Sequence, residues 1–190
     1  MNAVTLINEM LANINILFHG IIEDLSDEEW VSRPAPGSNR VAFTAWHLPR
    51  TQDHFIQLWI RGESEVIYGE RWLHWQHLRR YGSGIGITLE ESDEIALSLI
   101  REDVLDYEDA VYNQSSRWLH NLIDPDLDLT PNMREYLSAY PDYLTAGYHR
   151  DTEHLLDLPA WCLLMRPCIG HVYRHLGELE LAKELFRKRS

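Results

Sequence analysis

The sequence has little cysteine, no long apolar run and no leader-like N-terminus. Cys162 and Cys168 are the two cysteines among 190 residues, and six positions apart on one predicted helix they point in different directions, so no disulfide framework is indicated. The first residues lack a basic region followed by an apolar stretch, and no run of about 18 apolar residues occurs. We therefore expect a soluble, cytoplasmic protein with reduced thiols.

Basic residues are also scarce relative to acidic ones. The chain holds 17 Lys and Arg against 30 Asp and Glu, which gives a formal net charge of -13. Such a charge repels phosphate backbones and anionic membrane surfaces. The densest basic segment, Lys183 to Arg189, is typical of a helix C-terminus, where the macrodipole favours cations. Neither nucleic acid nor a membrane is therefore expected as a partner.

What the sequence does contain is enough apolar material for a core. Hydrophobic residues make up 45% of the chain and aromatic residues 11%, which is the range of ordinary globular proteins. The length is near that of one domain. We predict a single domain over residues 1–190.

Apolar residues recur at helical spacing in four long segments. The predicted helices span Val4 to Leu25, Val41 to Arg61, Glu91 to Ile123 and Pro159 to Arg187. In the first helix the repeating apolar residues are Leu6, Met10, Ile14, Leu17, Ile21 and Leu25. Pro49 lies inside the second helix, where proline removes a hydrogen bond and collides with the preceding turn, so we expect a kink or a later start there.

The connections between these helices differ in length. Residues 63–90, rich in aromatic residues and then in glycine, are predicted to cover one end of the helices. A long crossing from Leu127 to Leu158, with a short helix near 132–139, precedes the last helix. With no segment alternating at the period of a strand, we predict an all-α fold: an antiparallel four-helix bundle with a long crossover before the last helix.

The last helix interrupts its apolar seam with a histidine. The seam steps by four and three through Trp161, Met165, Cys168, Val172, His175, Leu179, Ala182 and Phe186, the spacing of a bundle core. His175 thus occupies an apolar position, and His171 lies one turn earlier on the same face, where two imidazoles can share one ion. The alternative interpretation is a hydrogen-bonded core histidine beside a surface one, because short motifs often match by chance.

A divalent ion on two imidazoles needs a third protein ligand if it is to keep an open position. His47 is the best candidate, because it lies inside the second helix near its apolar face. His54 lies two turns further along roughly the same face and is the second choice. Its depth differs from that of His47 by about 10 Å at 1.5 Å rise per residue, so both cannot bind one ion. Cys168 is more simply a core residue than a thiolate ligand. His74 and His77 can either line a pocket mouth or lie on an exposed helical turn.

Two stretches resemble the ligand segments of the DinB-like superfamily. They are Ala45-Trp46-His47-Leu48, with Asp53-His54 after it, and His171-Val172-Tyr173-Arg174-His175-Leu176-Gly177-Glu178. The turn from Leu25 to Trp30, Arg33-Pro34 and the glycine-bearing segment before Thr88-Leu89-Glu90-Glu91 extend the resemblance over nearly the whole chain. Members of that superfamily are metal-binding four-helix bundles with one histidine on the second helix and a histidine pair on the fourth.

The resemblance implies a divalent metal site of nickel or zinc type on His47, His171 and His175, with an open coordination position. It also implies a homodimer and, in the thiol-transferase-like branch, transfer of a low-molecular-weight thiol to an electrophilic small molecule. Arg50, three residues after His47, and Arg174, next to His175, are candidates to bind carboxylates of such a thiol. The alternative for both is surface ion pairing within this acidic chain, which is the commoner role of arginine.

Two positions depart from the family pattern. Pro49 stands where relatives usually carry a helix former, and it bears on the orientation of His47. Glu178 stands where many relatives have Gln, and it is either a carboxylate partner that orients His175 or an exposed neighbour. We expect four residues to lie near the metal ligands, either behind them or in the substrate pocket: Arg50, His54, Arg174 and Glu178.

Other functions remain open from the sequence. The ion can activate water, which would make the protein a metal-dependent hydrolase, or it can tie helices together in a non-catalytic, stress-related binding protein. A closed shell of four ligands favours the binding protein, whereas three histidines beside a solvent-reached pocket favour an enzyme.

Overall fold

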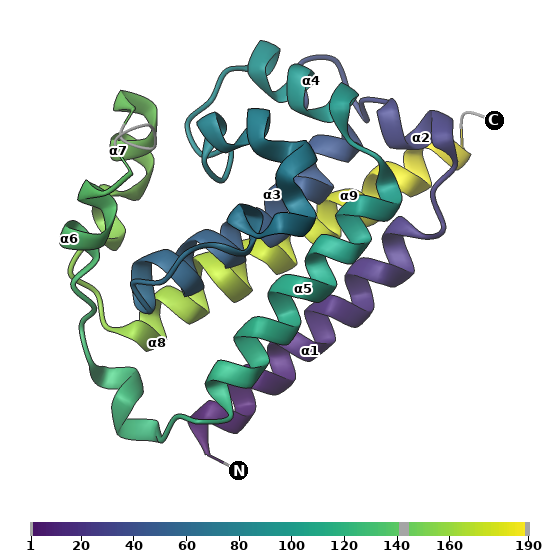
Figure 1. The fold of residues 1–190 in the computed structure, drawn as a ribbon. Helices are drawn as coiled ribbons and strands as arrows, with labels where there is room; N and C mark the ends of the chain where they lie inside the picture. Colours follow the sequence, from purple (N-terminus) through teal and green to yellow (C-terminus); the bar gives the residue numbers. More distant parts are fainter. Residues whose placement is uncertain (1, 141–144, 189–190) are drawn as a thin grey trace.

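The computed structural model describes residues 2–140 and 145–188, and these parts contain helices and no strand. The long helical segments lie side by side (Figure 1), and there are four of them in the described residues. They are α1 (Ala3–Ile22), α3 (Val41–Asp53) continued by the π-helix η1 (His54–Ile60), α5 (Arg101–Leu119), and a last segment made of α8 (Ala160–Leu163), the π-helix η7 (Leu164–His171) and α9 (Val172–Arg187). The predicted all-α four-helix fold is confirmed.

Hydrogen bonds between the helices give their directions. The start of α1 meets the end of α5, since the amides of Ala3 and Val4 donate to the carboxylate of Asp124 at 3.1 and 3.0 Å. Those two helices are antiparallel. By contrast, α1 and α9 end side by side, where Arg187 donates to the carboxylate of Asp24 at 2.9 Å. Those two helices are parallel.

The other two pairs repeat this combination. Arg50 of α3 donates a hydrogen bond to Tyr107 of α5. Seven residues later Gln57 donates to Ser115, eight residues after Tyr107. Because both helices advance in the same direction, α3 and α5 are parallel. The last segment runs the opposite way beside α3 (Figure 1). Each long helix thus has one antiparallel and one parallel neighbour, and a strict up-down-up-down order is not followed. The parallel pair α3 and α5 requires the long connection 61–100 between them.

The first long connection also breaks the predicted third helix in two. It contains the 3₁₀ segments η2 (Val66–Tyr68) and η3 (Glu70–Tyr81) and then α4 (Leu89–Ser98), which ends before α5 begins at Arg101. The prediction of one helix from Glu91 to Ile123 was wrong, because Leu99 and Ile100 adopt extended backbone with ψ of 134° and 132°. No proline or glycine marks this break, and apolar periodicity continues on both sides of it.

The second long connection carries the chain from α5 to α8. It comprises η4 (Asp124–Asp128), α6 (Met133–Ser138), α7 (Ala146–Thr152) and η6 (Glu153–Leu155). The short helix predicted near 132–139 is confirmed. Residues 141–144 of this crossing, and Arg189 of the basic C-terminal segment, lie outside the described residues.

The core face of α1 differs from the predicted one. Its buried residues are Val4, Ile7, Leu11, Ile14, Phe18, Ile21 and Ile22. Leu6 and Leu17 of the predicted stripe are 44% and 41% exposed, because α1 is apolar on more than one side and the packing of α5 and α9 selects the face. By length and mean hydropathy (1.2), α1 is also the one described helix that could cross a membrane, with 33% of that stretch buried in the bundle.

The last segment begins as predicted after Pro159, but its first turns have a different register. Trp161 and Met165 of the predicted seam are 45% and 36% exposed, whereas Cys168 and Val172 are fully buried. Pro167 has no N–H for an α-helical bond to the carbonyl of Leu163, and the chain forms the π-helix η7 there. The wider π turn rotates the earlier residues away from the seam.

The second long helix begins at Val41, as predicted, and continues through Pro49 without a later start. It too turns π-helical, at η1. π-Helical segments are rare and occur frequently at functional sites. Here both helices that carry the candidate ligands contain one.

Candidate metal centre

Three histidines from two helices converge between α3 and the last helical segment. His47 comes from α3, His171 ends η7, and His175 lies one turn further on α9. One ligand nitrogen from each lies within 4.8 Å of the other two, and the Nε2 atoms of His47 and His171 are 3.0 Å apart. A tetrahedral ion with Zn–N bonds near 2.0–2.1 Å places its ligand atoms about 3.3 Å apart, so this cluster fits a divalent ion.

The hydrogen bond of His47 fixes its tautomer. Nδ1 lies 2.6 Å from the carbonyl oxygen of Ser83, and because a carbonyl only accepts, Nδ1 carries the hydrogen. The lone pair of Nε2 then points toward the other two histidines. The ring of Phe43 stacks on the imidazole, with centroids 5.7 Å apart and planes 12° apart. The hydrogen bond at Nδ1 and the stacked ring of Phe43 therefore fix the orientation of the His47 imidazole, with Nε2 available to bind an ion.

The Ser83 carbonyl belongs to a glycine loop that packs tightly against α3. Gly84 has φ of +83°, and a Cβ there would lie 3.0 Å from the ring of Phe43. Both the backbone conformation and the space therefore require glycine at this position. The loop that orients His47 thus depends on a residue with no side chain.

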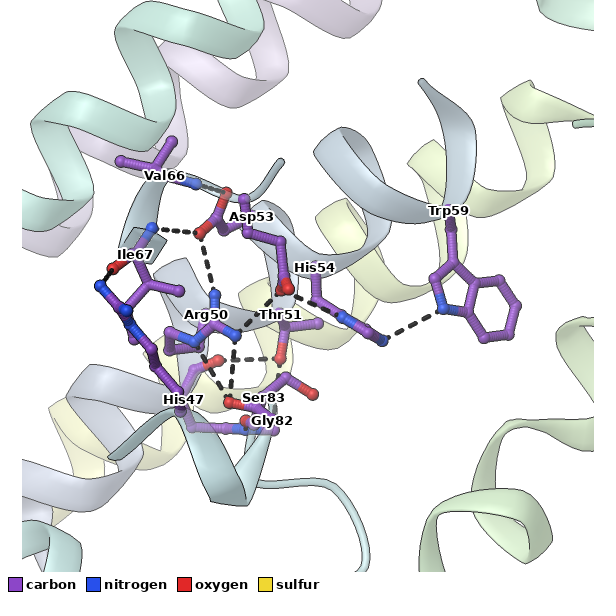
Figure 2. Close-up of polar contacts among 12 residues, drawn as sticks. His47, Arg50, Thr51, Asp53, His54, Trp59, Val66, Ile67, Gly82 and Ser83 are labelled. Atoms are coloured by element: carbon purple, nitrogen blue, oxygen red, sulfur yellow. Dashed lines mark hydrogen bonds and ion pairs between the residues drawn. The ribbon is translucent and has the colours of Figure 1, made fainter. Parts of the chain in front are cut away.

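Arg50 also binds this loop, at Gly82, the residue before Ser83 (Figure 2). Its Nε and Nη2 donate to the carbonyl oxygen of Gly82 at 3.2 and 3.1 Å. The guanidinium is fully buried and also donates to the carboxylates of Asp53 and Glu65, both at 2.9 Å. Arg50 therefore ties the peptide next to Ser83 to a charged network inside the bundle.

The acidic members of this network are satisfied by backbone and side chains. Asp53 accepts from the amides of Val66 and Ile67 at 2.8 and 3.2 Å (Figure 2) and from the hydroxyl of Tyr107. Burial raises the pKa of Asp53 to about 6, against the lowering effect of Arg50. A buried charge network with this many partners is rigid, but it depends on every partner.

His54 belongs to this network and not to the histidine cluster. Its Nδ1 lies 3.1 Å from Glu65, and its Nε2 lies 2.7 Å from the hydroxyl of Tyr148 on α7. The indole of Trp59 donates to the same hydroxyl at 2.9 Å. The structure therefore separates His54, the second choice of ligand, from His47.

The two histidines of the last segment take their partners from the surface of their own helix. Nδ1 of His175 donates to the carboxylate of Glu178 at 2.6 Å, which leaves Nε2 as the free acceptor. Nδ1 of His171 lies 3.0 Å from a guanidinium nitrogen of Arg174, and because arginine only donates, this Nδ1 accepts. Glu178 and Arg174 thus contact the imidazoles, as expected for residues near the ligands.

The environment keeps two of the imidazoles neutral. Burial, followed by the charge of His175, lowers the pKa of His47 to about 4. Burial, followed by the charges of His47 and His175, lowers the pKa of His171 to about 3. Metals bind the unprotonated imidazole, so both side chains are in the charge state that a ligand needs at neutral pH. His171 must also move its hydrogen from Nε2 to Nδ1 before Nε2 can bind an ion.

The histidines form part of the wall of a cavity of about 510 Å³. Its lining includes apolar residues from four parts of the chain, Phe43, Phe55, Ile85, Leu155 and Pro167. It also includes the polar residues Asn39, Thr44, Thr51, Asp151, His154, Arg166 and Arg174. A ligand in this cavity reaches the three imidazoles directly. The volume is in the range of small-molecule sites.

Other predicted candidates lie elsewhere. Arg50 is fully buried and does not line the cavity, so a ligand there does not reach it. His74 and His77 lie on the exposed surface of η3, where His74 pairs with Asp103 at 3.2 Å. Cys168 is fully buried in the core, and burial raises the pKa of its thiol.

Sequence reasoning missed the Ser83 carbonyl and Arg166. A backbone carbonyl leaves no residue-type signal, although the sequence marks the glycine loop as a distinct segment. Arg166 lies five residues before His171, and only the π-helical turn of η7 brings it to the same cavity. An α-helical projection gives no reason to group the two.

A helical bundle with a histidine triad in a cavity wall defines a class of candidate metalloprotein. The model of the DinB superfamily matches residues 17–179 of this chain. The protein belongs to the DinB superfamily. A comparison with curated proteins finds no match.

Proposed function

We propose that this protein is a metal-dependent enzyme that holds a divalent ion on His47, His171 and His175 and transfers a low-molecular-weight thiol to an electrophilic small molecule. The observation that carries the proposal is the position of the three imidazoles in the wall of a 510 Å³ cavity. Within the described chain no Cys, Asp, Glu or further His joins the cluster. Three protein ligands beside an accessible space are the arrangement of catalytic sites, in which one position stays open.

The chain's own residues would prepare this site before a substrate arrives. The Ser83 carbonyl and Glu178 hold His47 and His175 with Nε2 available. Phe43, Phe55 and Leu155 give the cavity apolar walls, which exclude water and accommodate the carbon skeleton of an electrophile. A bound dication supplies one further element: it lowers the pKa of a coordinated thiol, as it does for water.

The remaining parts of the proposal rest on the family resemblance and on ligand chemistry. Imidazole ligands suit zinc and nickel, which are the metals we expect. We expect a homodimer, and a cytoplasmic location in which cellular thiols are kept reduced.

Elemental analysis of the purified protein tests the first part of the proposal. We expect one zinc or nickel ion per chain. The metal-loaded protein is then incubated with monobromobimane and a panel of thiols, among them cysteine and glutathione, and the rate of conjugation is compared with the rate without protein. A bound metal without accelerated conjugation of any thiol contradicts the transferase and favours a metal-stabilised binding protein. Hydrolysis of an ester panel would instead favour the hydrolase.

A further inference from the structure

Two arginines line the metal cavity without an ion pair. Most described arginines pair with a carboxylate within 4.0 Å; these are Arg33, Arg40, Arg50, Arg61, Arg71, Arg80, Arg101, Arg134, Arg150 and Arg187. Arg166 of η7 and Arg174 of α9 line the cavity and form no ion pair with any residue in the described parts of the chain. Arg79 and Arg117 also form no ion pair among the described residues, but they donate to backbone carbonyls and do not line the cavity. What distinguishes Arg166 and Arg174 is that both line the same cavity, in a chain with a net charge of -13.

The cavity lining offers these arginines little internal compensation. Its one carboxylate is that of Asp151, and the guanidinium of Arg150 already binds that carboxylate at 2.7 and 3.0 Å. The lining therefore carries an excess of positive charge even before an ion is added. A divalent ion on the histidines would increase that excess and would favour an anionic ligand further.

The hydrogen bond that the Arg174 side chain makes in the structure also favours an anion in the cavity. The guanidinium donates to Nδ1 of His171. A neutral His171 that binds an ion through Nε2 carries its hydrogen on Nδ1, and that hydrogen faces the Arg174 donors. Metal binding and this contact therefore exclude each other. When an ion is held, Arg174 requires another acceptor, and the adjoining cavity is where one can be supplied.

We propose that Arg166 and Arg174 form an anion subsite in the metal cavity, which binds an oxyanion group such as a carboxylate of a small-molecule ligand. The inference rests on the proposed metal site, and it specifies the chemistry of the molecule that enters it. One end of the ligand reaches the histidine cluster, and the anionic end lies against the two guanidinium groups. Guanidinium groups match carboxylates in geometry and bind them in pairs of parallel hydrogen bonds.

A pair of thiols that differ in one charge tests the subsite. Protein loaded with Co²⁺ is titrated with mercaptopropionate and with mercaptoethanol, and binding is followed by the thiolate-to-cobalt charge-transfer absorbance. The wild type should bind mercaptopropionate about tenfold more tightly, as expected for a charge-assisted hydrogen bond. In the double variant Arg166→Gln, Arg174→Gln, loaded with Co²⁺ to the same occupancy, this preference should disappear. The measured quantity is the ratio of the two thiol affinities within each protein, because Arg174 contacts the ligand His171. Arg117→Gln, an exposed arginine away from the cavity, should keep the preference.

The possible results distinguish a failure of the anion subsite from a failure of the thiol-transferase function. Equal affinity of the wild type for both thiols, or a preference retained in the double variant, overturns the subsite. If neither thiol binds, the thiol-transferase function fails instead. The subsite is then judged by calorimetric titration with succinate, whose binding must occur in the wild type and be lost in the double variant. Both arginines are exposed, so the double variant should melt at the wild-type temperature.

Discussion

The two sides of the histidine cluster are held by different kinds of contact. On the α3 side, His47 is 7% exposed and bonds to the carbonyl of Ser83, and the fully buried Arg50 donates to the carbonyl of Gly82, one residue earlier. On the α9 side, His171 and His175 bond to side chains of their own helix that lie in solvent, Arg174 and Glu178. The α3 side is part of the folded core, whereas the α9 side is adjustable at the surface.

Because of this difference, mutations on the two sides should affect the stability of the fold and the affinity for the metal ion differently. A change in the buried network around Arg50 leaves buried carboxylates without their partner, which costs folding free energy. A change at Glu178 disturbs the orientation of one ligand but uncovers nothing buried. We therefore expect mutations on the α3 side to affect folding and metal binding together, and mutations on the α9 side to affect metal binding alone.

The largest effect is expected when a ligand is removed from either side. His175→Ala and His47→Ala should each abolish stoichiometric metal binding, because two imidazoles hold an ion poorly. The apparent affinity should fall by more than about 100-fold, beyond the 10–100-fold typical of losing only the hydrogen-bond partner of a ligand. Elemental analysis after dialysis measures the metal content. His77→Ala, at an exposed position outside the cavity, is the control, and full metal content in His175→Ala would refute the site.

Arg50→Met tests the α3 side by removing the buried cation while keeping an apolar stem. The variant leaves Asp53 and Glu65 buried without their guanidinium partner, and this should reduce the free energy of unfolding by about 3–5 kcal/mol. Urea denaturation in the presence of a chelator measures the loss. Burial already raises the pKa of Asp53 to about 6, and the variant removes a charge that lowers it, so proton uptake should make the loss smaller at pH 5 than at pH 8.

The matched control for that variant is Arg117→Met, which removes an exposed arginine bonded only to a carbonyl of its own helix. We expect a change within about 0.5 kcal/mol. If Arg50→Met is equally mild, the buried network does not stabilise the α3 side, and the comparison between the two sides fails.

Much of this arrangement could be predicted from the sequence. The spacing of His171 and His175, and the apolar position of His175, are local features of one helix. The placement of His47 on the opposite helix came from the need for a third ligand and from the family resemblance. The structure brings these three residues together because the helices that carry them pack side by side.

The parts that could not be predicted depend on distant or backbone contacts. Arg50 meets Gly82 and Glu65 through chain reversals that no local pattern records. The π turn around Pro167 shifts the register of the last segment, so the apolar seam read as one α-helix misplaces Trp161. The break before α5 has no proline or glycine, and only the backbone angles at Leu99 and Ile100 reveal it.

Glu108 of α5 is a second buried carboxyl group, and it lacks the hydrogen-bond partners that Asp53 has. It is 1% exposed, and neither carboxylate oxygen has a hydrogen-bond partner among the described residues. Burial raises its pKa to about 7 from 4.5. The folded protein therefore binds a proton that the unfolded chain releases, and stability declines as the pH rises from about 4.5 to above 7.

Glu108→Gln should remove this decline. At pH 5 the variant and the wild type should differ little, and at pH 8 the variant should be more stable by up to about 3 kcal/mol, from 1.36 kcal/mol per unit of pKa shift. Urea denaturation at a series of pH values measures the difference. A difference that does not grow with pH would show that Glu108 is ionised in the folded protein at no cost.

The smallest effect is expected at Glu178, on the α9 side. Its side chain is 56% exposed, so Glu178→Ala should change the free energy of unfolding by no more than about 0.5 kcal/mol. The same variant removes the acceptor for Nδ1 of His175 and should weaken metal binding by about 10–100-fold. Glu178→Gln keeps an oxygen that can accept this hydrogen bond and should recover most of the affinity. Competition with a chromophoric chelator measures the three affinities. If Glu178→Gln binds metal as poorly as Glu178→Ala, the carboxylate acts through its charge and not by orienting His175.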